Sequence, residues 1–148
     1  MRKYQFAKIY YNWVIDCLTE DKKWEELAFF RLGVDLMVRQ HELARIEWSQ
    51  IRYQYVYNIE ISKRVSPLEC NEKRYYEPKV ISMQTYNALT KIRNEGCTGK
   101  IFPNDPMRYI GSISESIGVD FRGTYLRSLG IILKVGLIEN MKKGYGKL

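Results

Sequence analysis

The chain has 148 residues, of which 45% are hydrophobic, and a formal net charge of +7 at pH 7. This length suffices for one well-buried core or two small units, and the hydrophobic content excludes an intrinsically disordered chain. No apolar run approaches the roughly 18 residues needed to cross a bilayer, and the first residues lack a small-residue cleavage site, so we expect a soluble, cytoplasmic protein without membrane contact.

Catalytic groups and metal ligands are sparse in the sequence. The three cysteines, Cys17, Cys70 and Cys97, lie far apart and lack the close spacing of a zinc or redox site, which favours buried thiols in a reducing compartment. The single histidine, His41, falls on an apolar helical seam, where a core imidazole is favoured over a general base. Without a phosphate loop or nucleophile motif, we predict a non-enzyme that needs no metal or cofactor.

Positive charge is concentrated in the second half of the chain. Residues 1–80 contain 14 Lys and Arg against 12 Asp and Glu, a balance of +2. Residues 81–148 contain 10 against 5, a balance of +5. A concentrated positive field attracts polyanions, although many solvated surfaces are basic without binding anything.

The region 1–80 is expected to be mainly helical. Helical spacing predicts a first amphipathic helix that ends near Thr19, with these residues on one face: Phe6, Ile9, Tyr10, Trp13 and Cys17. A second pattern begins at Leu27 and recurs in steps of three and four: Phe30, Val34, Met37, His41, Ala44, Trp48 and Ile51. This seam predicts contact with a partner helix, either within the chain or across a homodimer interface, and the sequence leaves both open.

The period changes to two in residues 51–62, where apolar and polar residues alternate as in a half-buried strand. The helical seam also continues into this stretch, so a longer helix remains an alternative, with β-branched and aromatic enrichment tilting the choice towards strand. Residues 62–79 contain two prolines and no sustained period, and they are interpreted as the connection to a second unit, 81–148.

Helix start and stop signals are clearer beyond residue 81. Ser82 can cap a helix that ends at Gly96, and Asp105 followed by Pro106 can start another that ends at Gly118. A third helix is predicted from a cap at Asp120 to Gly136. After it, "LIENM" is expected to form a strand, "KKGYG" a hairpin turn and "KL" the start of a returning strand.

This order of elements resembles the winged helix-turn-helix family. The segment "SESIGV" followed by "GTYLRSLGIILKVGLIE" is similar to that family's glycine turn, leucine-bearing third helix and entry to a wing, and the likeness covers residues 82–148. It departs from the family pattern where "VDF" lengthens the turn and where the chain leaves room for only a very short last strand. The resemblance implies a mainly α fold with a small β-wing (α+β), preceded by an N-terminal helical region.

Helix geometry assigns faces to the third predicted helix. With Leu129 at the centre of the buried face, Gly130, Ile131 and Lys134 fall towards solvent. An interior glycine costs about 1 kcal/mol relative to alanine, and we interpret Gly130 as a point where a groove wall or phosphate strand approaches the backbone. The alternative is that strong tertiary packing tolerates a glycine there. Gly123 is more simply part of the turn.

The resemblance implies that this helix, 120–135, enters a major groove of duplex DNA. The candidates for base contacts are Arg122, Thr124 and Arg127, while Ser128 and Lys134 are expected to face phosphates. In the predicted wing, 142–147, the candidates for groove or backbone contacts are Lys142, Lys143, Tyr145 and Lys147.

Two functions remain open from the sequence. The first is a regulator of transcription that binds double-stranded DNA and dimerises through its N-terminal helices, as two half-sites would require. The second is a non-catalytic assembly module whose winged domain docks on RNA or on another protein, which the solvent-facing apolar residue Ile131 favours. Fold alone does not choose between them.

Overall fold

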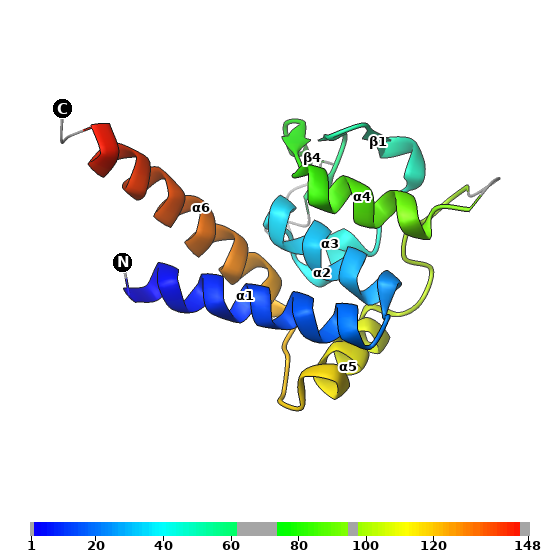
Figure 1. Ribbon diagram of the computed structural model, residues 1–148. Coiled ribbons are helices and arrows are strands. Elements are labelled where there is room, and N and C mark those ends of the chain that lie inside the picture. Colours follow the sequence, from blue (N-terminus) through cyan, green and yellow to red (C-terminus); the bar gives the residue numbers. More distant parts are fainter. Residues whose placement is uncertain (1, 62–73, 95–97, 146–148) are drawn as a thin grey trace, which may run out of the picture.

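The computed structural model describes residues 2–61, 74–94 and 98–145, with side chains described as far as Glu139. The described chain is mainly helical, with two small antiparallel sheets, as the α+β prediction requires (Figure 1). Within these ranges, no helix is both long and apolar enough to cross a bilayer. The helices are α1 (Arg2–Glu20), α2 (Trp24–Leu36), α3 (Gln40–Leu43), α4 (Met83–Ile92), α5 (Pro106–Ile117) and α6 (Thr124–Tyr145).

Helix α2 lies at the centre of the core. It packs against α1, α3, α4, α5 and α6, and its buried residues include Leu27, Ala28, Phe29, Phe30, Leu32, Gly33, Val34 and Leu36. A helix that is apolar on nearly every face is stable only when other elements surround it. Buried residues on both sides of residue 80 belong to one core, while the division of the chain at that point stays a prediction.

The seam that begins at Leu27 does not form one long helix. Helix α2 ends at Leu36 because Met37 adopts the left-handed conformation, with φ 55°, and a short 3-10 helix, η1 (Trp48–Gln50), follows later. Phe30 and Val34 are buried against other parts of the same chain, as the intramolecular alternative requires, while a homodimer stays a prediction. His41 was expected in the core and is instead exposed, because it lies on α3, beyond that break.

Residues 51–61 form strands rather than a helix. Strands β1 (Ile51–Arg52), β2 (Tyr55–Val56) and β5 (Lys79–Val80) make a three-stranded antiparallel sheet, in which Ile51 pairs with Val56 and Tyr55 with Val80. Strands β3 (Glu60–Ile61) and β4 (Arg74–Tyr75) form a second antiparallel pair. The predicted strand is therefore interrupted, because the chain reverses at Tyr53, whose φ is 54°.

The predicted caps of α4 and α5 are confirmed. Ser82 Oγ accepts a hydrogen bond from the Thr85 amide at 3.2 Å, and Asp105 Oδ1 accepts one from the Met107 amide at 2.8 Å. Gly118, with φ 75°, ends α5 in the left-handed conformation that glycine adopts without strain. The predicted terminator of α4, Gly96, lies outside the described residues.

Helix α6 is where the sequence prediction fails most. The helix begins at Thr124 rather than directly after Asp120, and it continues through Gly136 to Tyr145. The strand predicted for 137–141 and the wing turn that follows are therefore wrong within the described residues, since both fall inside this helix. Leu, Glu, Met and Lys after Gly136 are good helix formers, and a glycine ends a helix only where the backbone turns left-handed.

Two glycines of α6 serve close packing rather than termination or ligand approach. A Cβ added to Gly130 would lie 2.2 Å from the Val34 carbonyl oxygen, and one added to Gly136 would lie 2.1 Å from Cδ2 of Tyr4. The prediction that Gly130 faces solvent is wrong: it is buried against the end of α2.

Helices α1 and α6 project together from the body of the molecule and form an arm (Figure 1). We call residues 2–10 of α1 and 134–145 of α6 the arm. Helix α1 ends at Glu20, next to the end predicted near Thr19, but its packing face is Ala7, Val14 and Leu18. The larger residues Phe6 and Ile9, expected on the inner face, are exposed.

We predict opposite effects of two glycine-to-alanine changes. Gly130→Ala drives a methyl group into the Val34 carbonyl and should destabilise the fold by about 1–3 kcal/mol, the usual cost of overpacking. Gly111→Ala in α5 is the control, because a Cβ there meets no atom within 4 Å, and it should stabilise by up to about 1 kcal/mol through helix propensity. Urea unfolding followed by circular dichroism measures both, and equal stabilities would contradict the close packing at Gly130.

Candidate nucleic-acid interface

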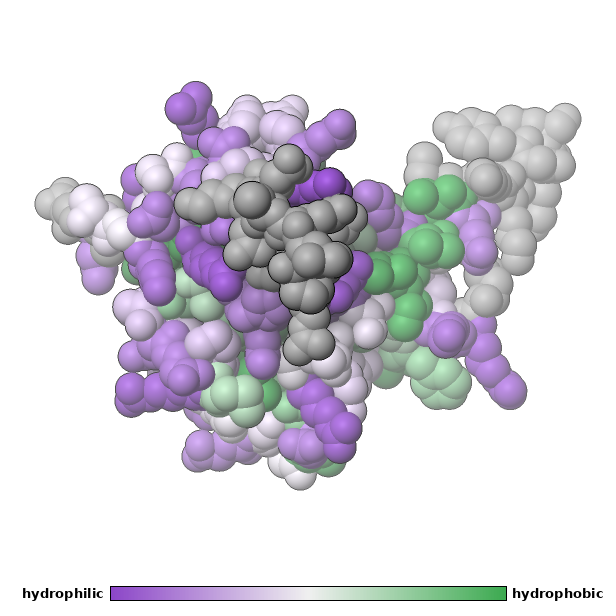
Figure 2. All heavy atoms as spheres, turned by 180° about the vertical axis from the view of Figure 1, so that it is seen from behind, coloured by the Kyte–Doolittle hydropathy of each residue, from purple (hydrophilic) through white to green (hydrophobic). Residues whose placement is uncertain are grey.

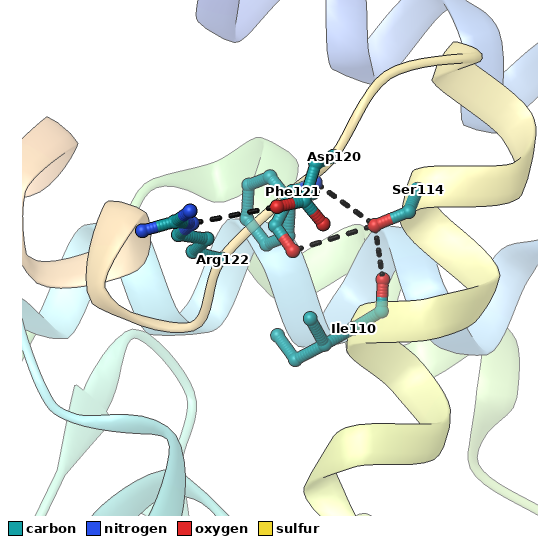
Figure 3. A network of polar contacts seen from close by, with 5 residues as sticks. All are labelled: Ile110, Ser114, Asp120, Phe121 and Arg122. Atoms are coloured by element: carbon teal, nitrogen blue, oxygen red, sulfur yellow. Dashed lines mark hydrogen bonds and ion pairs between the residues drawn. The ribbon is translucent and has the colours of Figure 1, made fainter.

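The turn between α5 and α6 is held by the Ser114 side chain (Figure 3). Ser114 Oγ accepts a hydrogen bond from the Phe121 amide at 2.9 Å, and it lies 3.0 Å from the Ile110 carbonyl oxygen and 3.3 Å from that of Phe121. The Phe121 ring is buried in the core, edge-on to Phe30 at a centroid distance of 5.7 Å. This anchor fixes where α6 starts.

Asp120 and Arg122 lie on the outer side of the same turn. Arg122 Nε is 3.4 Å from Asp120 Oδ2, and the two side chains are 70% and 77% exposed. Asp120, predicted to cap α6, therefore pairs with Arg122 instead, four residues before the helix begins. Exposed pairs of this kind contribute little to stability, so the Arg122 guanidinium stays available to a ligand.

The structure brings together three of the predicted contact residues at the start of α6. Thr124, Arg127 and Ser128 line a shallow groove of about 450 Å³. The opposite wall comes from residues around the start of α3, Arg39, Gln40 and His41. The sequence did not point to these residues, because they are far from α6 in the chain and become neighbours only when α6 packs on α2.

A second, more open groove of about 1520 Å³ continues along α6. Lys134 lines it from α6, and Tyr76 and Lys79 line it from the segment that contains β5. Burial and, after it, the nearby charge of Asp35 raise the pKa of Tyr11, also in this groove, to about 12. Tyr11 is therefore a neutral hydrogen-bonding group at physiological pH.

Four cations gather around these two grooves, and we call Arg39, Lys79, Arg127 and Lys134 the basic face. Burial lowers the pKa of the Lys79 ammonium below its usual value; the charges of Lys134 and Arg127 lower it further, while Glu42 acts in the opposite direction. Arg39 joins this group because it lines the same groove as Arg127. The basic face thus assembles cations from three separate segments of the chain.

Two of the acids beside the basic face, Glu42 and Asp35, are engaged by helix N-termini, while Asp16 and Glu77 also line the larger groove. Glu42 Oε1 accepts a hydrogen bond from the Arg39 amide at 3.0 Å, at the start of α3. Asp35 Oδ2 accepts bonds from the Ser82 amide at 2.9 Å and from Thr85 Oγ1 at 2.6 Å, at the start of α4. Within the described ranges, Arg39, Arg127 and Lys134 form no ion pair with a carboxylate.

The residues predicted to form a wing lie elsewhere than at this site. Lys142, Lys143 and Tyr145 fall in the last turns of α6, and Lys147 lies outside the described residues. Fifteen residues of helix separate Arg127 from Lys142, a rise of roughly 22 Å along the axis. A helix of this length carries Lys142 away from the groove at the start of α6 instead of folding back towards it.

Comparison with protein-family models, curated proteins and solved structures finds no match for this chain. The resemblance to winged helix-turn-helix proteins therefore stays a prediction. Among residues 2–61, 74–94 and 98–145, no three His, Cys, Asp or Glu side chains gather in a way that would hold a metal ion.

We predict that two serine-to-alanine changes in α5 differ in their effect on stability, because only the Ser114 side chain holds the turn before α6. Ser114→Ala leaves the Phe121 amide without its acceptor and should lower the free energy of unfolding by about 1 kcal/mol. Ser116→Ala removes a buried hydroxyl that has no partner among the described residues, so it should be neutral or slightly stabilising. Thermal unfolding of both variants tests this, and an equal loss in the two would refute the anchor.

Proposed function

We propose that this protein is a non-catalytic, intracellular nucleic-acid-binding protein that holds the backbone of duplex DNA against its basic face. The observation that carries the proposal is that Lys79, Arg127 and Lys134 gather along the two grooves, where burial first and then the two neighbouring cations lower the pKa of Lys79. Like charges held close together raise the free energy of the unbound protein, and a polyanion relieves that cost.

A phosphate backbone suits this arrangement better than a small anion. The cations follow two adjoining grooves rather than converging on one point, and a duplex presents phosphates in a continuous row. Thr124 and Ser128 add hydroxyl groups beside Arg127 at the start of α6, where a helix N-terminus also favours negative charge. Arg122, exposed in the preceding turn, extends this set.

In this proposal α6 inserts its first turns into the major groove, as the helix-turn-helix part of the resemblance implies. Thr124 and Arg127 are then the residues that contact base edges, and Arg39, Lys79 and Lys134 bind phosphates on either side. The wing is replaced in this role by the segments around α3 and β5. Regulation of transcription is the use that this kind of binding serves most directly.

A second candidate, an assembly module that docks on a protein, is favoured by one observation. The outer face of α6 becomes apolar after Ser128: Ile131, Val135 and Ile138 recur at helical spacing and are 43%, 49% and 45% exposed. Apolar side chains contribute nothing to phosphate binding, although one of them can contact a thymine methyl group.

We expect the protein to bind random duplex DNA with an affinity that falls steeply as salt increases. Arg127→Ala should weaken binding on the order of tenfold and reduce the salt dependence by about one phosphate contact. Lys100→Ala is the matched control, because it removes one positive charge from a residue that lines neither groove and should leave affinity nearly unchanged. Fluorescence anisotropy at two salt concentrations measures both.

Two outcomes of that titration would decide against this function. An absence of affinity at low salt would remove DNA binding and leave the protein-docking candidate. Equal weakening by Arg127→Ala and Lys100→Ala would show that net charge, not the basic face, attracts the duplex. If Arg127 contacts bases, its loss should also relax sequence preference in a selection from a random duplex library.

A further inference from the structure

The outer surface of α1 carries a regular stripe of exposed residues. Its members recur in alternating steps of four and three, the spacing of a helix seam that meets another helix: Arg2, Phe6, Ile9, Trp13, Asp16 and Glu20. Phe6 is 67% exposed, Ile9 66% and Trp13 39%. We call these six residues the α1 stripe. Large apolar side chains in a row on a helix surface mark an interaction surface more often than solvated polar residues do.

The rest of the described chain does not cover the stripe. Helix α6 packs against α1, but it meets the other side of α1, where Ala7, Val14 and Leu18 are buried and the Tyr4 ring sits on Gly136. Hydrophobic atoms gather on the projecting arm in the space-filling view (Figure 2). The described chain therefore leaves the α1 stripe open, and it also leaves the apolar outer face of α6 open.

The charges along the stripe identify the partner that fits it. Arg2 stands at one end, Asp16 and Glu20 stand at the other, and the apolar residues lie between them. A parallel copy of the same helix would place Arg2 against Arg2 and acid against acid. An antiparallel copy brings opposite charges together at both ends, so the stripe is complementary to itself under a two-fold rotation.

We propose that the protein forms a homodimer in which the α1 stripes of two copies pack antiparallel. In the register that uses the whole helix, Ile9 packs on Trp13 of the partner subunit, and Arg2 faces Glu20 of the partner subunit. Antiparallel helix pairs alternate their two seam positions in this way, so Phe6 lies opposite Asp16 of the partner subunit, between the apolar centre and the charged ends. Asp16 of the stripe also lines the larger groove beside the basic face, but the inference does not depend on DNA binding.

The apolar part of the stripe is tested by adding one charge inside it. Wild-type protein should sediment as a dimer at micromolar concentrations, and Ile9→Glu should sediment as a monomer, because the pairing would bury a carboxylate at its centre. Thr19→Glu adds the same charge to an exposed position of α1 outside the stripe and should remain dimeric. Circular dichroism of each variant confirms that the monomer remains folded.

The antiparallel register is tested by reversing charges. Arg2→Glu places like charges together at both ends of the dimer and should weaken association roughly tenfold. Combining Arg2→Glu with Glu20→Arg restores opposite charges in the antiparallel arrangement and should recover the wild-type dissociation constant. A monomeric wild type, a dimeric Ile9→Glu or a double variant no tighter than Arg2→Glu would each overturn the proposal.

Discussion

The contact between Gly130 and the Val34 carbonyl is the constraint on which the rest of the arrangement depends. It lets the backbone of α6 lie directly on the end of α2, where any side chain would hold the two helices apart. That contact places Arg127 beside the residues of α3, and it places Lys134 beside Lys79. It also directs the second half of α6 along α1. The positions of the basic face and the arm therefore follow from one close approach of two helices.

Features controlled by short-range chemistry were predictable from the sequence. The caps at Ser82 and Asp105 and the left-handed end at Gly118 depend on atoms within one helical turn, so residue type and spacing suffice to identify them. The role of Gly130 depends on what approaches it, and its neighbour Val34 lies far away in the chain. The large residues Phe6 and Ile9 indicated the wrong inner face of α1, because close packing against α6 selects the small side of the helix, which includes Ala7.

The residues of the candidate site also differ in whether the sequence alone could identify them. Thr124, Arg127 and Ser128 were predicted together because they share one helix, and periodicity places residues of one helix on a common face. Arg39 and Lys79 carry no local signal that distinguishes them from other surface cations. They belong to the site only because the chain folds α3 and β5 next to α6. The prediction of a wing was wrong because it assumed that the helix ends at Gly136, whereas α6 continues beyond it.

The position of α6 also determines the order in which the molecule can be completed during synthesis. Helix α6 covers part of α2, where the Leu126 side chain lies against Gly33, yet it follows α2 at a large sequence separation. In a nascent chain the residues of α1 and α2 emerge long before those of α6, and until then the part of α2 that α6 covers lacks this cover. Long-range contacts of this kind slow folding and expose intermediates to aggregation. The protein therefore becomes compact late, and a chaperone that shields α2 during translation would protect it at its most vulnerable stage.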